Sequence, residues 1–236
     1  MIPPGIFTTA LLFIVFLLLL LVTLSVPIIK TIFLFRLTAA ASSGFFNSSA
    51  SSSVVFGVWG YCTSGVDVSV ASINRDAPGH CSERKLGYTF DSTVARALHV
   101  SGFEKLISKG LTAVLALHPV VVCLTFIVLV LSLFALRRRE VHGSARLWSL
   151  LLFGVGVLTA ILTTIVFLID VILVAVVRHR VHTDTDGVLT LNWGNAVWMT
   201  LTATILLWIA VIGSLTGVCC GNQWRFRRRP VNEEKF

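Results

Sequence analysis

The stretch from Ile6 to Ile29 reads IFTTALLFIVFLLLLLVTLSVPII and contains no charged residue. Three further apolar segments follow at 111–136, 147–177 and 196–220. Each reaches the roughly 20 residues that a helix needs to cross the hydrocarbon core of a bilayer. The sequence therefore predicts an integral membrane protein with four transmembrane helices.

Composition supports the same class of protein. Hydrophobic residues make up 56% of the chain and charged residues only 13%, which leaves too few polar side chains to cover a water-soluble fold of 236 residues. The polar sequence is divided among the segments 1–5, 30–110, 137–146, 178–195 and 221–236. We expect one small domain in the longest of these segments and no separate soluble catalytic domain.

Arginine is concentrated in two short segments, and this predicts the orientation. Short loops rich in Lys and Arg stay on the cytoplasmic side. These residues are Arg137, Arg138, Arg139 and Arg146 in one loop, and Arg225, Arg227, Arg228 and Arg229 in the tail. Both termini are therefore expected in the cytoplasm and segment 30–110 outside. The tail arginines follow a helix end, so we expect them to bind anionic lipid headgroups rather than nucleic acid.

Segment 178–195 is the exception to this charge pattern, because Arg178 and Arg180 would lie outside. The histidines and aspartates between 179 and 186 could hold a metal by spacing alone, but they match no fixed ligand motif. We therefore expect a solvated external loop without a metal.

The first segment is predicted to be a retained helix rather than a signal peptide. Its apolar run exceeds the ~7–15 residues of a signal-peptide core, and no Lys or Arg precedes it. The small residues Ala39-Ala40-Ala41 leave cleavage open as an alternative.

The cysteines fall into three environments. Cys62 and Cys81 are the two in segment 30–110, and an oxidising exterior would let them form a disulfide worth ~3 kcal/mol. Cys123 lies within the second apolar segment and is expected to be inert. Cys219 and Cys220 precede the basic tail, where they are either palmitoylated or simply packed.

Segment 30–110 also carries local structural signals. Asn47 begins an acceptor sequon for glycosylation, within a serine-rich stretch from Ser42 to Ser53 that has the composition of a solvated linker. β-branched and aromatic residues predict a small antiparallel sheet with strands at 54–56, 58–61 and 66–70. The spacing of apolar residues at 94–107 predicts a short amphipathic helix.

Several of these motifs together resemble those of one family. They are Leu24-Ser25-Val26-Pro27-Ile28-Ile29-Lys30, Phe56-Gly57-Val58-Trp59-Gly60-Tyr61-Cys62, Cys81-Ser82 with Leu86-Gly87-Tyr88, and Leu117-His118-Pro119. In outline the chain resembles the claudin superfamily, and in these motifs it is similar to the fungal PalI family, which is related to the Sur-seven proteins of eisosomes. The resemblance covers nearly the whole chain.

The resemblance implies an all-α, claudin-like membrane protein: a bundle of four transmembrane helices with a small, disulfide-stapled, β-rich extracellular domain. It further implies a non-enzymatic protein of the fungal plasma membrane, without a cofactor, in ambient-pH signalling, membrane-domain organisation or cell-wall integrity. The expected partners are a larger membrane protein or further copies of the chain, in an anionic membrane that could be rich in sterol or sphingolipid. No nucleic acid is expected.

Polar residues within the predicted helices are few. Asp170 and His118 each lie about eight residues from the external end of their helix, which places both roughly 12 Å below that end. They could form a pair that responds to protons. Alternatively, the third helix protrudes and Asp170 is solvated or pairs with Arg178. Pro119 is expected to kink the second helix.

Two classes of function remain open. Gly213, Gly217 and Gly221 recur every four residues and would let another helix approach closely, which favours an accessory or scaffold protein. The alternative is a sensor subunit that uses His118 and Asp170. One acid, one histidine and scattered threonines are too few to line a hydrated path, so a channel or transporter is disfavoured.

Overall fold

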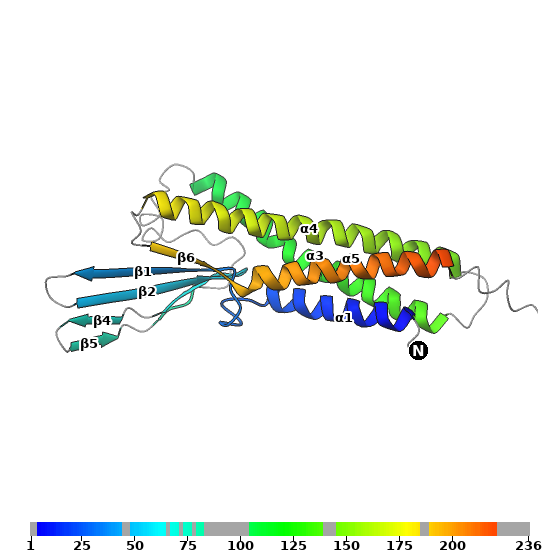
Figure 1. The fold of residues 1–236 in the computed structure, drawn as a ribbon, viewed down its shortest axis with the longest axis horizontal. Helices are drawn as coiled ribbons and strands as arrows, with labels where there is room; N and C mark the ends of the chain where they lie inside the picture. The colour runs from blue at the N-terminus through cyan, green and yellow to red at the C-terminus, as the bar shows by residue number, and fades with distance from the viewer. Residues whose placement is uncertain are drawn as a thin grey trace, which may run out of the picture.

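A computed structural model describes residues 4–43, 48–64, 67–70, 73–76, 79–82, 104–138, 145–184 and 189–220. Four long helices lie side by side, and a β-sheet extends beyond one end of the bundle (Figure 1). The N-terminus lies at the opposite end (Figure 1). The expected architecture, a four-helix membrane bundle with a small sheet, is confirmed.

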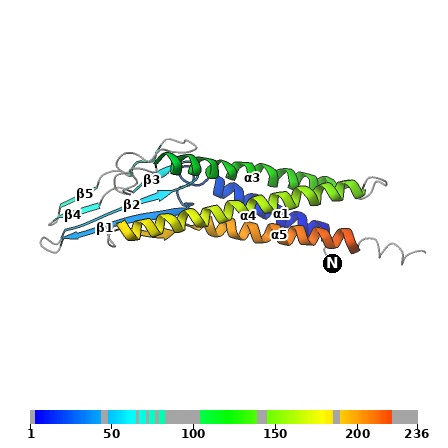
Figure 2. The same ribbon diagram turned by 90° about the horizontal axis from the view of Figure 1, so that it is seen from above.

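The helices are α1 (Pro4–Thr23), α3 (Glu104–Arg138), α4 (Ala145–Asp184) and α5 (Asn195–Cys220). Each contains a candidate membrane span of 19 to 30 residues. α1 and α4 both contact α3 and α5, so the four helices form a ring (Figure 2). Large apolar side chains are exposed along all four, as a surface that faces lipid requires.

The first helix ends at Thr23, six residues before the predicted end at Ile29. A turn follows at 24–28 and contains a cis bond between Val26 and Pro27. Proline has no N–H for the helix ladder and disfavours a helical conformation in the residue before it, which explains the early end.

α3 and α4 extend further toward the sheet than their apolar segments do. α3 is continuous from Glu104, so the end of the predicted amphipathic helix at 104–107 belongs to it, and 94–103 lies outside the described residues. α4 continues to Asp184, and β6 occupies Leu189–Trp193. The described part of segment 178–195 is therefore largely helix and strand, with Arg178, His179 and His182 exposed.

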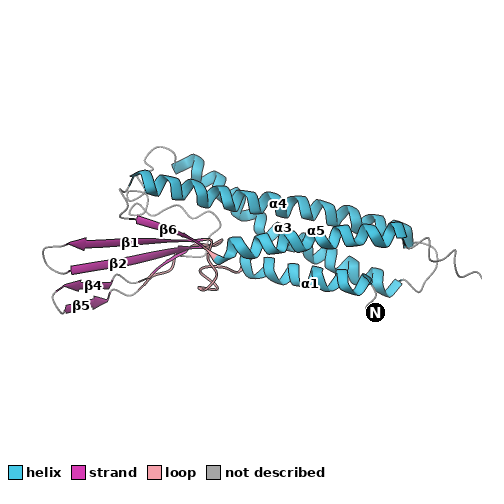
Figure 3. Cartoon of the chain, in the orientation of Figure 1, coloured by secondary structure: helices cyan, strands magenta, loops and turns pink. Residues whose placement is uncertain are grey.

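The sheet has six strands, and β5, β4, β2, β1 and β6 are adjacent in that order (Figure 3). β3 pairs with β2 outside this order. The strands are β1 (Phe35–Ser43), β2 (Ser48–Phe56), β3 (Tyr61–Thr63), β4 (Asp67–Val70), β5 (Ile73–Asp76) and β6. All described pairings are antiparallel. The predicted strands at 54–56 and 67–70 are present, but Val58 to Gly60 form a turn instead of a strand.

The serine-rich stretch is not a linker. Ser42 and Ser43 end β1, Ser48 begins β2, and the two strands pair from Phe35 with Phe56 out to Ser43 with Ser48. The register of the two strands is set at their apolar end, where Phe35 pairs with Phe56. Backbone hydrogen bonds then continue the pairing through small residues, whose side chains have little preference for strands. Ala39, Ala40 and Ala41 lie within β1, while Asn47 is outside the described residues.

Buried apolar side chains form two clusters. The sheet-end cluster joins the helix ends to the sheet and includes Val22, Phe35, Phe56, Val58, Leu115, Val174, Val181 and Val197. The bundle cluster lies among the helices and includes Leu12, Leu19, Val121, Val122, Val128, Val166 and Leu207.

Candidate functional site

The segment from Phe56 to Cys62 fastens the sheet to the end of α1. Phe56 stacks on Phe35 with ring centroids 4.6 Å apart, and its carbonyl accepts a 2.7 Å hydrogen bond from the Leu34 amide. The Val58 amide donates to the Ser25 hydroxyl at 3.0 Å in the turn that follows α1. The tryptophan-glycine motif thus acts as a latch between two regions of the chain.

Trp59 and Gly57 define the geometry of this latch. The indole Nε1 of Trp59 donates a 2.5 Å hydrogen bond to the carbonyl of Thr23, one of the helix-end carbonyls that has no partner within the helix. At Gly57, an added Cβ would overlap the Val26 carbonyl oxygen. Only glycine therefore permits this close approach of the two backbones.

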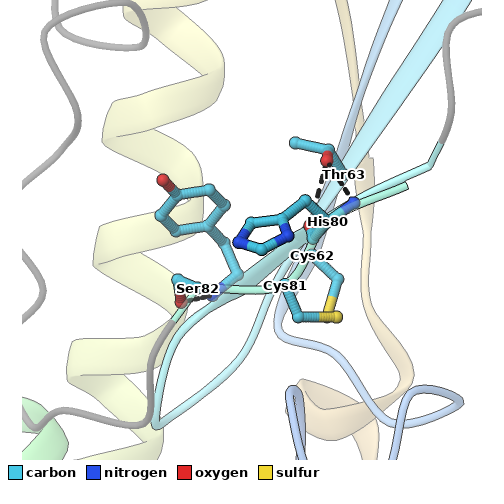
Figure 4. Close-up of a disulfide and its surroundings, with 6 residues drawn as sticks. Cys62, Thr63, His80, Cys81 and Ser82 are labelled. Carbon is cyan, nitrogen blue, oxygen red and sulfur yellow. Dashed lines mark hydrogen bonds between the residues drawn. A yellow bond between two sulfur atoms is a disulfide. The ribbon is translucent and has the colours of Figure 1, made fainter. Parts of the chain in front are cut away.

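The predicted disulfide between Cys62 and Cys81 is present (Figure 4). These cysteines also form an isolated antiparallel bridge, flanked by hydrogen bonds from the Thr63 amide to the His80 carbonyl at 2.8 Å and from the Ser82 amide to the Tyr61 carbonyl at 2.9 Å. The disulfide therefore attaches segment 79–82 to β3.

A second fastening, which sequence reasoning missed, lies at the start of α5. The Asn195 side chain accepts from the Phe33 amide at 3.1 Å and donates to the Thr31 carbonyl at 2.8 Å. A Cβ on Gly194 would overlap the Phe33 carbonyl oxygen. Asparagine directly before an apolar run is a helix-start signal that could have identified this position.

His118 and Asp170 meet inside the bundle. His118 Nε2 lies 3.2 Å from Asp170 Oδ2, and each residue is only 2% exposed. The alternative of a solvated Asp170, or of an Asp170 paired with Arg178, is therefore wrong for this structure. His118 Nδ1 is buried and has no hydrogen-bond partner among the described residues.

The pair lies between the two apolar clusters. Leu115 and Val174, about one turn toward the sheet on α3 and α4, belong to the sheet-end cluster. Val121, Val122 and Val166, about one turn in the other direction, belong to the bundle cluster. The His118–Asp170 contact thus joins α3 to α4 at the boundary between the bundle cluster and the sheet-end cluster.

Other predicted positions are less informative. A Cβ on Gly213 would lie 3.7 Å from the Thr8 hydroxyl oxygen, so this glycine faces α1 within the chain. Gly217, Cys219 and Cys220 belong to α5, but their side chains are not described. The remaining predicted positions fall outside the described residues: Asn47, Gly87, Tyr88, Gly221, Arg225, Arg227, Arg228 and Arg229.

Four candidate spans, a latched sheet at one end and the disulfide define a claudin-like four-span membrane protein. Residues 5–210 match the model of the SUR7/PalI family. The chain belongs to this family.

Three curated fungal relatives carry the name pH-response regulator. A palI/prr-5 protein of Neurospora crassa is 30% identical over 236 residues, which is 100% of this chain and 27% of the relative. The palI/RIM9 proteins of Pyricularia oryzae and Emericella nidulans are 31% and 28% identical, covering 65% and 88% of this chain and 17% and 30% of themselves. The chain thus spans less than a third of each relative's length.

Proposed function

We propose that this protein is a non-enzymatic subunit of a fungal pH-response apparatus in the plasma membrane, where it associates with a larger membrane protein. The observation that carries the proposal is the similarity of its membrane unit to three pH-response regulators. The arginine-rich segments favour cytoplasmic termini and an external sheet.

The interior of the bundle favours association over transport. Its described buried threonine hydroxyls donate to the backbone carbonyl four residues earlier, as those of Thr125, Thr163 and Thr204 do. Groups satisfied in this way offer a solute few free ligands. A cavity near Gly156 and Ser214 of about 10 Å³ is large enough for at most one water molecule.

The latch gives the external sheet a fixed position relative to the helices. A partner could therefore contact both the sheet and the lipid-facing helix surfaces at once. Such a two-part surface suits a protein that escorts or stabilises another membrane protein, because rigid presentation lowers the entropy cost of binding.

The test is purification of the tagged, full chain from its fungus in mild detergent, followed by mass spectrometry. We expect one membrane protein to be recovered in stoichiometric amount, and deletion of the gene to impair growth after a shift of external pH. Bulky substitutions at the outward-facing positions Phe13, Cys123, Gly154 and Ile212, one on each helix, should identify the helix that contacts this protein.

Normal thermal unfolding and an intact disulfide would show that a variant lost the partner rather than the fold. A wild-type protein that is recovered alone, and that crosslinks to nothing in native membranes, would contradict the accessory role.

A second candidate is a proton-responsive sensor subunit. The specific observation in its favour is the buried contact between His118 and Asp170. Charged and titratable groups are rare within membrane spans, and those that occur usually serve a function.

A further inference from the structure

Among the described residues, the His118–Asp170 pair has no other charged group beside it. The described helices α1 and α5 contain no acidic, basic or histidine residue. In the spans of α3 and α4, the other titratable or charged groups are Cys123, which is exposed, and Arg178 and His179, about two turns beyond Asp170 and also exposed. Within the part of the chain that the structure describes, a charge on one member of the pair can therefore be balanced only by the other member.

The balance depends on a single proton. With that proton on either member, the pair is electrically neutral overall, as an imidazolium with a carboxylate or as an imidazole with a carboxylic acid. Without it, a neutral imidazole faces a carboxylate, and one uncompensated negative charge remains in an apolar environment. Such a charge is strongly unfavourable unless water or a counter-charge reaches it.

The unpartnered ring nitrogen is a second, independent observation. A buried histidine with a purely structural role normally satisfies both ring nitrogens. Here Nδ1 is buried without a partner among the described residues, so the Asp170 contact is the one described polar contact that orients the ring. If the His118–Asp170 contact were lost, no other described hydrogen bond would join α3 to α4 at this position along the bundle.

The pair is also directly adjacent to the contacts that seat the sheet. Val174 and Val181 lie on the same face of α4 as Asp170, by their helical spacing, and both are buried in the sheet-end cluster. The same cluster contains Phe35 and Phe56, at the anchored ends of β1 and β2. A separation of α3 from α4 at the pair would therefore loosen the packing beneath the sheet.

We propose that His118 and Asp170 form a buried proton-binding site, in which one shared proton holds α3 against α4 and its loss loosens the sheet-end cluster. The ligand is the proton itself, delivered from the water on the sheet side. This inference rests on the proposed function only for its biological use, because the site operates within the isolated chain.

The experiment measures how readily water-borne reagents reach the cluster. The full chain with Cys123→Ser, Cys219→Ser and Cys220→Ser keeps its disulfide, and Val174→Cys adds one buried thiol. The protein is reconstituted in phosphatidylcholine–phosphatidylglycerol nanodiscs and labelled with a charged maleimide from pH 5.5 to 8.5. A second protein carries Asp170→Asn in addition. At each pH, the ratio of the two labelling rates cancels the intrinsic pH dependence of the thiol.

We expect labelling of the pair-intact protein, relative to the Asp170→Asn protein, to rise at least tenfold between pH 5.5 and 8.5. A ratio that stays constant would overturn the proposal. If Asp170→Asn alone does not fold, the neutral His118→Gln/Asp170→Asn pair replaces it as the reference. A thiol introduced by Val128→Cys, in the bundle cluster, should stay unlabelled throughout, and equal labelling there would indicate general unfolding and also overturn the proposal.

The outcome is separable from that of the proposed function. A protein that shows the labelling response but brings no partner contradicts the accessory role alone. A protein that brings a partner but shows a constant ratio contradicts the proton site alone.

Discussion

The two ends of the helix bundle are built on different principles. At the sheet end, backbones approach too closely for any Cβ at Gly57 and Gly194, and the contacts include an indole bond, a disulfide and a buried His–Asp pair. Toward the termini, the bundle cluster consists of aliphatic side chains. The described polar contacts between helices there are a 2.7 Å hydrogen bond between the hydroxyls of Thr9 and Ser132 and a 3.1 Å hydrogen bond from the Trp208 indole to the Thr164 hydroxyl.

This difference predicts different tolerance to substitution. Aliphatic packing can be rearranged as long as volume is kept. A close backbone approach leaves no room for an added side-chain atom, and a buried pair of opposite charges does not tolerate the loss of one partner alone. The sheet end should therefore be sensitive to small changes, and the terminal half should not.

The largest effect is expected at the buried pair. His118→Leu leaves Asp170 without its partner and should lower the free energy of unfolding by about 3–5 kcal/mol, measured by thermal unfolding in nanodiscs. The double variant His118→Leu/Asp170→Leu should recover most of this loss, because no charge is then buried. A double variant as unstable as the single one would show that shape, not charge, decides stability here.

Next in size is Gly57→Ala, for which we expect a loss of about 3 kcal/mol, because the Val26 backbone has to move. Gly154→Ala is the matched control, since no atom outside its own helix and neighbours lies within 4 Å of the added Cβ. It should be neutral or stabilising by up to about 1 kcal/mol through helix propensity. Equal losses of stability for Gly57→Ala and Gly154→Ala would show that the close approach at the sheet end does not make Gly57 more sensitive to substitution.

Removing the disulfide by Cys62→Ser and Cys81→Ser together should cost about 2–4 kcal/mol, because the unfolded chain regains the entropy of an open loop. The exposed Cys123→Ser provides the control and should leave the melting temperature unchanged. A stable double variant would mean that hydrogen bonds alone hold segment 79–82 on β3.

Trp59→Phe keeps an aromatic ring but loses the indole bond to Thr23, at a cost of about 1 kcal/mol. Trp198→Phe is the matched control, since Trp198 is 62% exposed on α5. We expect no change in the melting temperature for the control, and a comparable loss at both positions would argue against a specific latch.

The smallest effect belongs to the terminal half. Ser132→Ala removes the bond to Thr9, and hydrogen bonds between helices in membranes contribute about 0.6 kcal/mol on average. A loss larger than that of Trp59→Phe, measured in the same unfolding assay, would reverse the order of sensitivity proposed for the two ends.

Sequence alone was sufficient for the elements with strong local signals. Runs of apolar residues identified the four spans, since a lipid-facing helix needs little beyond length and hydrophobicity. The isolation of Cys62 and Cys81 in one segment predicted their disulfide. The end of α1 was predicted at Ile29, because the apolar run continues to that residue, but the helix ends at Thr23. Pro27 is the residue in the sequence that indicates the earlier end.

Only the tertiary structure could decide contacts between distant residues. The hairpin through Ser42 and Ser48 depends on register set at its far end, and the fastening by Asn195 depends on where segment 31–34 lies. His118 and Asp170 were candidates from sequence, but their contact depends on how α3 and α4 are placed and rotated against each other in the bundle. Hydrophobicity fixes that a helix spans, whereas side-chain packing fixes its depth and rotation against its neighbours.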